Sequence, residues 1–291
     1  MKPAPFEYHA PERPDEVVGL LSELGDEAKI LAGGQSLIPM LNLRLATFEH
    51  LVDVTRVEGL AGVERRNGSL WIGSATTDAA VERSADVAEA VPLLAKATPF
   101  VGHFQIRSRG TVGGSLAHAD PAAEYPAVAL ALDAEMEVLS PGGTRTVPAA
   151  EFFAGLWTTA IGEDELLVGT SFPVWTGRTG FAVEEFARRS GDFAIAGAAV
   201  GVELDAQDRL ARCTIGLIGL GTTPGRARDA ERQLTGTDLA SISSDEVGRL
   251  AVADLSSVPS DLHGTADYRT KVGATMVARA WTAATEEAAR A

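Results

Sequence analysis

The sequence predicts an α+β fold in two domains, and three observations carry that prediction. Up to about residue 176, short apolar runs alternate with segments of helical periodicity. The pattern then loosens around "WTGRTG", Trp175 to Gly180, where we expect a domain boundary. Beyond it, three extended segments are followed by three helical ones, which is typical of a three-stranded, antiparallel sheet covered by helices. We therefore expect domains over residues 1–176 and 177–291.

The elements of the first domain follow from local signals. In "RPDEVVGLLSELG", Pro14 suits the first turn of a helix, the valines and leucines form one apolar face, and Gly25 suits its end. The next segment, "AKILAGG", reads as a short buried strand that ends in two glycines. The other expected elements are strands at "HLVDVT", "SLWIGSATT" and "ELLVGTSFPV", helices over Asp78–Ser84, Val87–Val101 and Pro121–Leu132, and a hairpin at "EMEVLSPGGTRTV".

In the second domain the apolar runs are longer and the helices come last. The extended segments are "FAVEEFARR", "AIAGAAVGVEL" and "ARCTIGLIGLG". The helical segments are "PGRARDAERQL", "SSDEVGRLAVADL" and "YRTKVGATMVARAWTAATEEAARA".

Composition excludes several classes of partner. The 291 residues carry a formal net charge of -15 and no run of five basic residues, so we expect neither a nucleic acid nor an anionic membrane as partner. The N-terminus lacks the apolar core of a signal peptide, and charges or glycines interrupt every apolar stretch before it could span a membrane. These features indicate a cytoplasmic protein.

Cysteine and histidine usage argues against metal centres within this chain. The single cysteine, Cys213, excludes an internal disulfide and an iron–sulfur cluster held by four thiolates of this chain. We expect it to be a buried apolar residue. The five histidines show no short metal-ligand spacing, and no metal site is predicted.

Two glycine pairs are the strongest functional signal. Gly33 and Gly34 in "ILAGGQSLIPMLNLRLA", and Gly113 and Gly114 in "IRSRGTVGGSLAHADPAAEYP", are each followed by small polar residues. Glycine lets a backbone approach a ligand closely and turn its N–H groups toward an anion, so two such loops could converge on one pyrophosphate. Either pair alone would be read as an ordinary turn. The G-x-x-x-x-G-K-[ST] and G-x-G-x-x-G phosphate motifs are absent from the sequence.

Together with their flanks, these two segments closely resemble the FAD-binding segments of molybdenum-hydroxylase flavoproteins, the medium subunits of the carbon monoxide dehydrogenase type. "RRSGDFAIAG", "GTTPGRARDAE" and "ADYRTKV" are similar to C-terminal landmarks of that family, so the resemblance covers nearly the whole chain. It implies an FAD-binding domain like that of vanillyl-alcohol oxidase, with lobes of about 1–55 and 56–176, followed by a smaller α+β domain.

The resemblance also implies which residues contact FAD. The glycine segments would hold the pyrophosphate and ribityl chain, and Asp120 and Glu124 would lie near the cofactor's hydroxyls. A helix start at Asp120 is the alternative reading of these two acidic residues. Phe193 would pack by the isoalloxazine, although a core phenylalanine is an equally good interpretation. The full implied set is Ala32, Gly33, Gly34, Gln35, Ser36, Leu37, Thr111, Gly113, Gly114, Ser115, Asp120, Glu124, Val168 and Phe193.

The sequence departs from the family at two points. A lysine often found near the flavin ring is replaced by glutamate, at Glu184 or Glu185. Gln35 stands where members that oxidise carbon monoxide tend to carry histidine, which favours an organic substrate. His118 is expected to cap a loop and is given no catalytic role.

The function that the resemblance implies is electron relay. A large partner subunit would carry a molybdopterin cofactor, a small partner two [2Fe–2S] clusters, and this chain the FAD that passes electrons to an external acceptor. Relatives of this type double into a dimer of heterotrimers. Two alternatives stay open: a free-standing FAD-dependent oxidase or dehydrogenase with its own small substrate, and a structural subunit that has lost its flavin.

Overall fold

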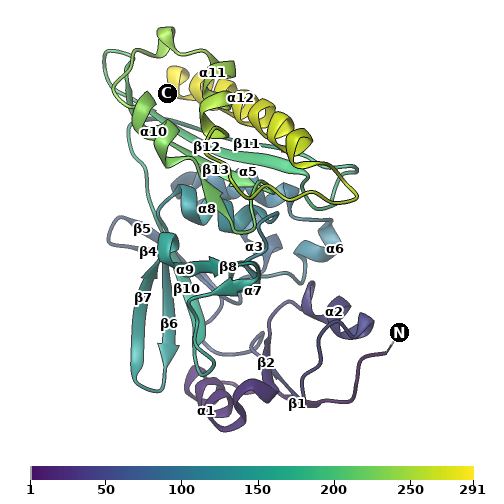
Figure 1. Ribbon diagram of the computed structural model, residues 1–291. Coiled ribbons are helices and arrows are strands. Elements are labelled where there is room, and N and C mark those ends of the chain that lie inside the picture. Colours follow the sequence, from purple (N-terminus) through teal and green to yellow (C-terminus); the bar gives the residue numbers. More distant parts are fainter. Residues whose placement is uncertain (1) are drawn as a thin grey trace.

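The computed structural model describes residues 2–291 and confirms the α+β class (Figure 1). The chain opens with a parallel sheet of order β1-β3-β2, whose strands are β1 (Glu7–His9), β2 (Ala28–Leu31) and β3 (His50–Asp53). Helix α1 (Pro14–Leu24) covers it with buried valine and leucine side chains, and ends at Gly25, whose φ of 54° suits glycine. The one-turn helix η1 (Gly25–Glu27) and helix α2 (Leu37–Leu43) complete this lobe.

The second lobe is built on an antiparallel sheet of order β4-β5-β10-β6-β7. Its strands are β4 (Val63–Arg66), β5 (Ser69–Gly73), β6 (Glu135–Ser140), β7 (Gly143–Pro148) and β10 (Leu166–Pro173). Short helices surround it: α3 (Asp78–Arg83), α4 (Ala85–Ala90), α5 (Pro92–Ala97), η2 (Thr98–Phe100), α6 (Phe104–Arg107), α7 (Val112–His118), α8 (Glu124–Ala131) and α9 (Ala149–Phe152), with a small ladder of β8 (Phe153–Gly155) and β9 (Thr158–Thr159).

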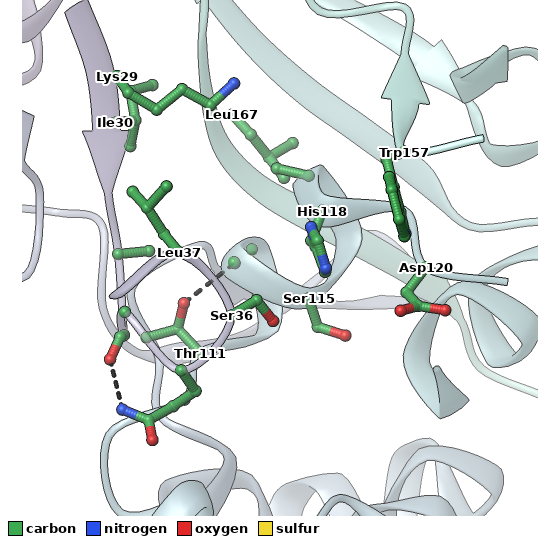
Figure 2. Close-up of a pocket in the computed structure, with 18 of the residues that line it drawn as sticks. Lys29, Ile30, Ser36, Leu37, Thr111, Ser115, His118, Asp120, Trp157 and Leu167 are labelled. Atoms are coloured by element: carbon green, nitrogen blue, oxygen red, sulfur yellow. Dashed lines mark hydrogen bonds between the residues drawn. The ribbon is translucent and has the colours of Figure 1, made fainter. Parts of the chain in front are cut away.

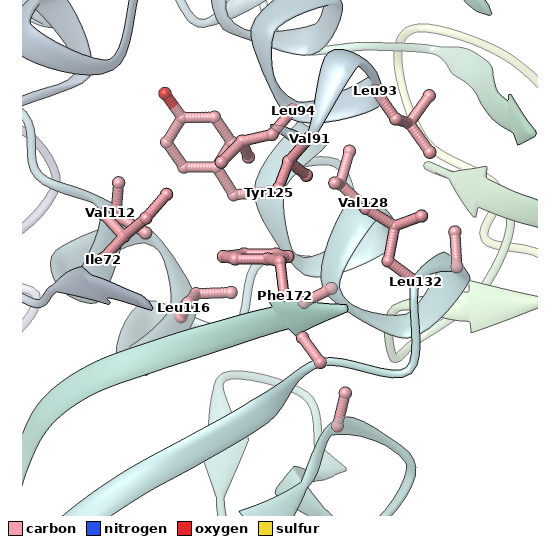
Figure 3. Packing of buried hydrophobic residues seen from close by; sticks show 14 of the residues in the cluster. Ile72, Val91, Leu93, Leu94, Val112, Leu116, Tyr125, Val128, Leu132 and Phe172 are labelled. Atoms are coloured by element: carbon pink, nitrogen blue, oxygen red, sulfur yellow. The ribbon is translucent and has the colours of Figure 1, made fainter. Parts of the chain in front are cut away.

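The core of this lobe lies between the sheet and its helices (Figure 3). Phe172 from β10 and Tyr125 from α8 are both fully buried, and the Tyr125 hydroxyl lies 3.1 Å from the Thr98 hydroxyl. Because the buried phenol has a hydrogen-bonding partner, the ring contributes its apolar area without leaving its polar end unpaired.

Two predicted helices begin or break differently from expectation. The segment Val87–Val101 was expected to be one helix, but α4 ends at Ala90 and α5 starts at Pro92. A proline cannot donate a helical hydrogen bond and forces the residue before it out of the helical region, and Val91 has a ψ of 65°. The helix predicted from Pro121 begins only at Glu124, because Asp120 holds the backbone in a turn by accepting a bond from the Ala122 N–H at 2.8 Å.

The C-terminal domain is an antiparallel sheet of order β11-β12-β13-β14. The three predicted long strands are present, and a two-residue strand at the edge was not foreseen. The elements are β11 (Arg178–Phe186), β12 (Ala196–Leu204), β13 (Leu210–Ile218), β14 (Gly225–Arg226), α10 (Arg228–Leu234), η3 (Leu239–Ser241), α11 (Ser244–Ala251) and α12 (Ala266–Arg290).

Helix α12 lies along β11 and β12 (Figure 1). Its close approach depends on Gly180, because a Cβ there would overlap the carbonyl of Ala284. Cys213 on β13 is buried, as predicted, and burial raises the pKa of its thiol to about 12.

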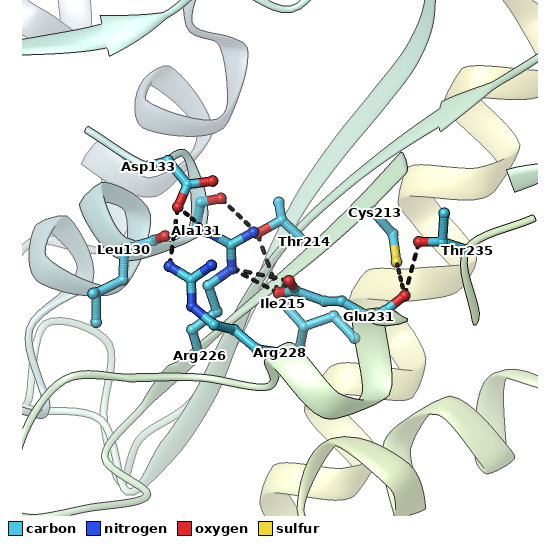
Figure 4. Close-up of polar contacts among 10 residues, drawn as sticks. All are labelled: Leu130, Ala131, Asp133, Cys213, Thr214, Ile215, Arg226, Arg228, Glu231 and Thr235. Atoms are coloured by element: carbon cyan, nitrogen blue, oxygen red, sulfur yellow. Dashed lines mark hydrogen bonds and ion pairs between the residues drawn. The ribbon is translucent and has the colours of Figure 1, made fainter. Parts of the chain in front are cut away.

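A polar cluster around the largely buried Arg226 and Glu231 joins this sheet to the end of α8 in the first domain (Figure 4). Arg226 donates to Glu231 at 2.9 Å, to Asp133 at 2.7 Å and to the Leu130 carbonyl at 2.8 Å. The Thr214 hydroxyl donates to the Ala131 carbonyl at 2.6 Å. Because the two carboxylates come from opposite sides of the boundary, this cluster fixes the C-terminal domain onto the end of α8. Within residues 2–291 no helix has the length and apolarity that a membrane crossing requires.

Candidate cofactor site

One large cavity lies where the two lobes and the C-terminal domain meet. Its volume is about 800 Å³. This lies at the upper end of the range for small-molecule and cofactor sites, roughly 300–1,000 Å³. Both predicted glycine segments line it, and the C-terminal domain contributes Gly191–Phe193. Figure 2 shows Ser36, Leu37, Thr111 and Ser115 from those segments around the cavity. The two segments singled out in the sequence therefore lie in the wall of one cavity.

The first glycine segment is a loop between β2 and α2, as predicted. Gly34 has a φ of 72°, in the left-handed region that favours glycine, and the Gln35 amide donates to the Gly33 carbonyl at 2.7 Å. Within residues 2–291, the backbone N–H groups of Gly33, Gly34, Gln35 and Ser36 have no protein acceptor. Backbone donors that face a cavity in succession make a site for an anion such as a diphosphate.

The second glycine segment is a helix start, and the prediction of a second glycine loop was wrong. Gly113 and Gly114 lie in the first turn of α7, which is preceded by the short helix α6. Thr111 is the N-cap and accepts from the Gly114 N–H at 3.0 Å, while the Gly113 N–H donates to the Ser74 carbonyl at 2.9 Å. These two N–H groups already have acceptors, so this segment offers the cavity side chains such as Ser115.

The glycines of the two segments allow the protein to pack against itself. A Cβ on Gly33 would overlap the Arg109 carbonyl and the Cα of Gly110, and one on Gly114 would lie 3.3 Å from the Cβ of Ala32. A Cβ on Gly113 would overlap Ser74. Close backbone contact thus joins the first segment to the second, and the second to β5.

Two buried polar groups in the cavity wall lack partners within residues 2–291. They are the Ser74 hydroxyl and the Asp78 Oδ1. Buried polar groups are nearly always hydrogen-bonded, so these two atoms fit a bound molecule that carries hydroxyl groups. Burial, reinforced by the charge of Glu124, raises the pKa of Asp78 to about 7. Both residues were missed in the sequence, because Ser74 follows β5 and Asp78 begins α3, and no motif marks either position.

The other predicted site residues are placed as follows. Asp120 and Glu124 line the cavity, and burial raises the pKa of Glu124 to about 7. Phe193 also lines it and is 70% exposed, so its interpretation as a core phenylalanine was wrong. Val168 is not among the cavity-lining residues of the described chain; it packs against the core of the first lobe, and its neighbour Leu167 lines the cavity instead.

Further lining residues were assigned no role in cofactor binding from the sequence. Lys29 and Phe48 lie toward the first lobe, with the Lys29 ammonium 5.8 Å from the centre of the Phe48 ring. His118 and Trp157 stack with ring centres 6.3 Å apart and planes 7° from parallel (Figure 2). Burial lowers the pKa of His118, which favours a neutral ring. Their side chains meet only in the folded chain.

The predicted replacement of a lysine by glutamate has a structural counterpart at Glu185. Its Oε2 is buried and has no partner within residues 2–291. Burial, with a contribution from the charge of Glu124, raises the pKa of Glu185 to about 8. A neutral carboxylic acid is therefore favoured near pH 7, where the family pattern has a cation.

Comparisons with known proteins agree with this geometry. Residues 4–175 match the family described as "FAD binding domain in molybdopterin dehydrogenase", and residues 181–284 match the "CO dehydrogenase flavoprotein C-terminal domain". The chain is 42% identical to the 6-hydroxypseudooxynicotine dehydrogenase complex subunit alpha of Paenarthrobacter nicotinovorans, over 96% of this chain and 94% of the relative. It is 38% identical to the carbon monoxide dehydrogenase medium chain of Hydrogenophaga pseudoflava, over 98% of both chains.

Solved structures give the same result. Carbon monoxide dehydrogenase from Hydrogenophaga pseudoflava, in a form lacking the Mo-pyranopterin moiety, superimposes with a TM-score of 0.95 over 99% of both chains at 38% identity. Quinoline 2-oxidoreductase from Pseudomonas putida 86 does so with a TM-score of 0.93 over 99% of both chains at 34% identity. The chain therefore belongs to the carbon monoxide dehydrogenase medium-subunit family and is the FAD-binding flavoprotein subunit of a molybdenum-containing dehydrogenase complex.

Proposed function

We propose that this chain holds one FAD non-covalently in the cavity and relays electrons from two [2Fe–2S] clusters of a small partner subunit to an external acceptor. A large partner subunit would hold the molybdopterin cofactor and the organic substrate. We also propose that the native particle is a dimer of such heterotrimers, and that the domain boundary lies at residue 177, between β10 and β11.

The observation that carries this proposal is the pairing of the two glycine segments in one cavity wall. The free N–H groups of Gly33–Ser36 would hold the diphosphate. The Ser74 hydroxyl and the Asp78 carboxyl, which have no partner within residues 2–291, would pair with hydroxyls of the ribityl chain or ribose. The cavity is also large enough for a dinucleotide. Its volume and these polar groups together fit FAD.

The remaining proposed contacts orient the cofactor and shield it. Ala32, Leu37 and Leu167 would exclude water from its apolar edge. Asp120 and Glu124 would accept from its hydroxyls, and Phe193 would pack on its ring system from the C-terminal domain. When bound, FAD supplies the redox chemistry, and this chain supplies position and environment.

Two observations support the proposed partners, one from a relative and one from this chain. The 42% identical relative is itself named as a subunit of a dehydrogenase complex. A relay needs a donor, and a chain whose only cysteine is the buried Cys213 cannot hold a cluster by four thiolates of its own.

The test is to produce the chain alone and together with its two proposed partners. Alone, it should bind about one FAD, and candidate organic substrates should leave that flavin oxidised. In the complex, which should contain molybdenum and iron, substrate should bleach the flavin absorbance. Rapid flavin reduction by a small substrate in the isolated chain would overturn the relay and support a free-standing oxidase or dehydrogenase.

A further inference from the structure

A second group of potential ligands lies on the parallel sheet of the first lobe, at strands β1 and β3. Glu7 is paired with His50 in the register of these strands, and His9 is two residues further along β1. Side chains alternate along a strand, so Glu7, His9 and His50 all lie on one face of the sheet. The two histidines are 41 residues apart in sequence, and only parallel strand pairing makes them neighbours.

The ligand atoms of these three residues converge. The His9 Nε2 lies 3.1 Å from the His50 Nδ1, which lies 3.6 Å from the Glu7 Oε2. All three ligand atoms are within 4.8 Å of one another. Zinc binds imidazole nitrogen and carboxylate oxygen at about 2.0–2.2 Å, which places neighbouring ligands of a tetrahedral site roughly 3.3–3.6 Å apart. Two of the three separations are thus close to those of a metal site before any ion is bound.

We propose that Glu7, His9 and His50, which do not line the cavity described above, form a binding site for a divalent transition-metal ion of the zinc type. Imidazole ligands with one carboxylate suit zinc, cobalt, nickel or copper better than calcium or magnesium. The Glu7 side chain is 75% exposed, so water completes the coordination from the solvent side.

The surroundings of the histidines favour a cation. Glu27 and Glu49 form a second set with His50, again with ligand atoms within 4.8 Å. Their negative charges attract a cation to this position. The His50 side chain is only 15% exposed, so its ring is already held in place.

The consequence would be a link between the first strand and the rest of the sheet. Strand β1 has three residues and pairs only with β3 within the described chain, so it is held by few hydrogen bonds. An ion bridging β1 and β3 would stabilise the folded state by mass action.

The experiment uses the full chain without an affinity tag, freed of metal by a chelator. Cobalt(II), whose visible absorption reports its coordination, is titrated first, and zinc is then used to displace it. We expect one ion per chain, an absorption typical of nitrogen and oxygen ligands, and a higher melting temperature with zinc. His9→Ala and His50→Gln should each weaken binding roughly tenfold or more.

The matched control is His263→Ala, which removes an exposed histidine far along the chain. It should bind cobalt as the wild type does. Melting temperatures without metal show whether each variant is folded, so a loss of binding in a folded His9→Ala protein supports the site. Equal cobalt binding by the wild type and the His9→Ala, His50→Gln double variant would overturn the proposal.

Discussion

The two glycine segments look alike in sequence and differ in what their backbones do. The first, at Gly33 and Gly34, is a loop whose N–H groups have no acceptor within residues 2–291. The second, at Gly113 and Gly114, opens helix α7 with these N–H groups bonded to Ser74 and Thr111. Glycine thus permits close packing in both segments, but only the first leaves successive backbone N–H groups without an acceptor. A glycine pair alone does not distinguish these two cases, because each needs only the absence of a Cβ.

The largest effect is expected where the two segments touch. In Gly33→Val the new side chain would overlap the Arg109 carbonyl and push the segments apart. We expect a loss of about 1–3 kcal/mol in the free energy of unfolding, together with loss of bound FAD after gel filtration. Gly114→Val should also lower the free energy of unfolding and the amount of bound FAD, because its Cβ would lie 2.9 Å from the Thr111 hydroxyl.

Gly19→Val is the matched control, since a Cβ there meets nothing within 4 Å. It should keep its flavin. If Gly33→Val were folded and fully loaded with FAD, the two segments would not meet in the way described.

The second largest effect concerns Phe193, which reaches the cavity from outside both segments. Phe193→Ala should weaken FAD binding roughly tenfold, because aromatic packing and apolar area are lost. Stability should change little, since the ring is 70% exposed. Phe193→Tyr should remain close to the wild type. Titration of the apo-protein with FAD and its melting curve decide this, and an unchanged affinity in the alanine variant would remove Phe193 from the site.

The third effect separates helix capping from cofactor binding. Thr111→Ala should cost about 1 kcal/mol of stability by removing the N-cap of α7. Ser84→Ala removes the N-cap of α4, which is away from the cavity, and should cost about the same. Only Thr111→Ala should also weaken FAD binding. If the whole cost of about 1 kcal/mol is lost from the binding free energy, the dissociation constant rises about fivefold. Equal affinities in the two variants would mean that the second segment does not hold the cofactor.

The smallest effect on FAD binding is expected at Glu185, which should instead make the stability of the chain depend on pH. Its folded-state pKa is raised to about 8, so the folded chain keeps a proton that the unfolded chain loses above its ordinary pKa near 4.5. Stability should therefore fall as the pH rises between about 5 and 8. Glu185→Gln should reduce this fall by up to several kcal/mol, measured by denaturation of the apo-protein at both pH values. An identical pH profile would show that Glu185 titrates normally.

Much of the fold could be predicted from the sequence, because its signals are local. Pro14 and Gly25 bound α1 as expected, and the long apolar runs of the C-terminal domain are its three long strands. The break before Pro92 was missed because helical periodicity continues through it, and α7 was missed because two glycines are unfavourable in a helix. Tertiary contact with Ser74 overrides that preference.

The predicted site rests on the family resemblance, and it omits cavity-lining residues for which no motif exists. Ser74, Asp78 and Trp157 lie in the cavity wall, but they come from segments that meet only after folding. The same limit applied to His9 and His50, whose spacing of 41 residues gave no sign of a shared site. Val168 on β10 was predicted to contact FAD, but the residues of this strand that line the cavity are Leu166 and Leu167.

The central claim is tested most directly by amide hydrogen exchange of the chain with and without FAD, resolved to single residues. The account predicts that the amides of Gly33–Ser36 exchange quickly without cofactor and gain strong protection when FAD binds. The amides of Gly113 and Gly114 should already be protected and gain much less, because their hydrogen bonds are present in the folded chain. Equal gains in both segments, or no gain at Gly33–Ser36, would contradict the division of roles between the two segments.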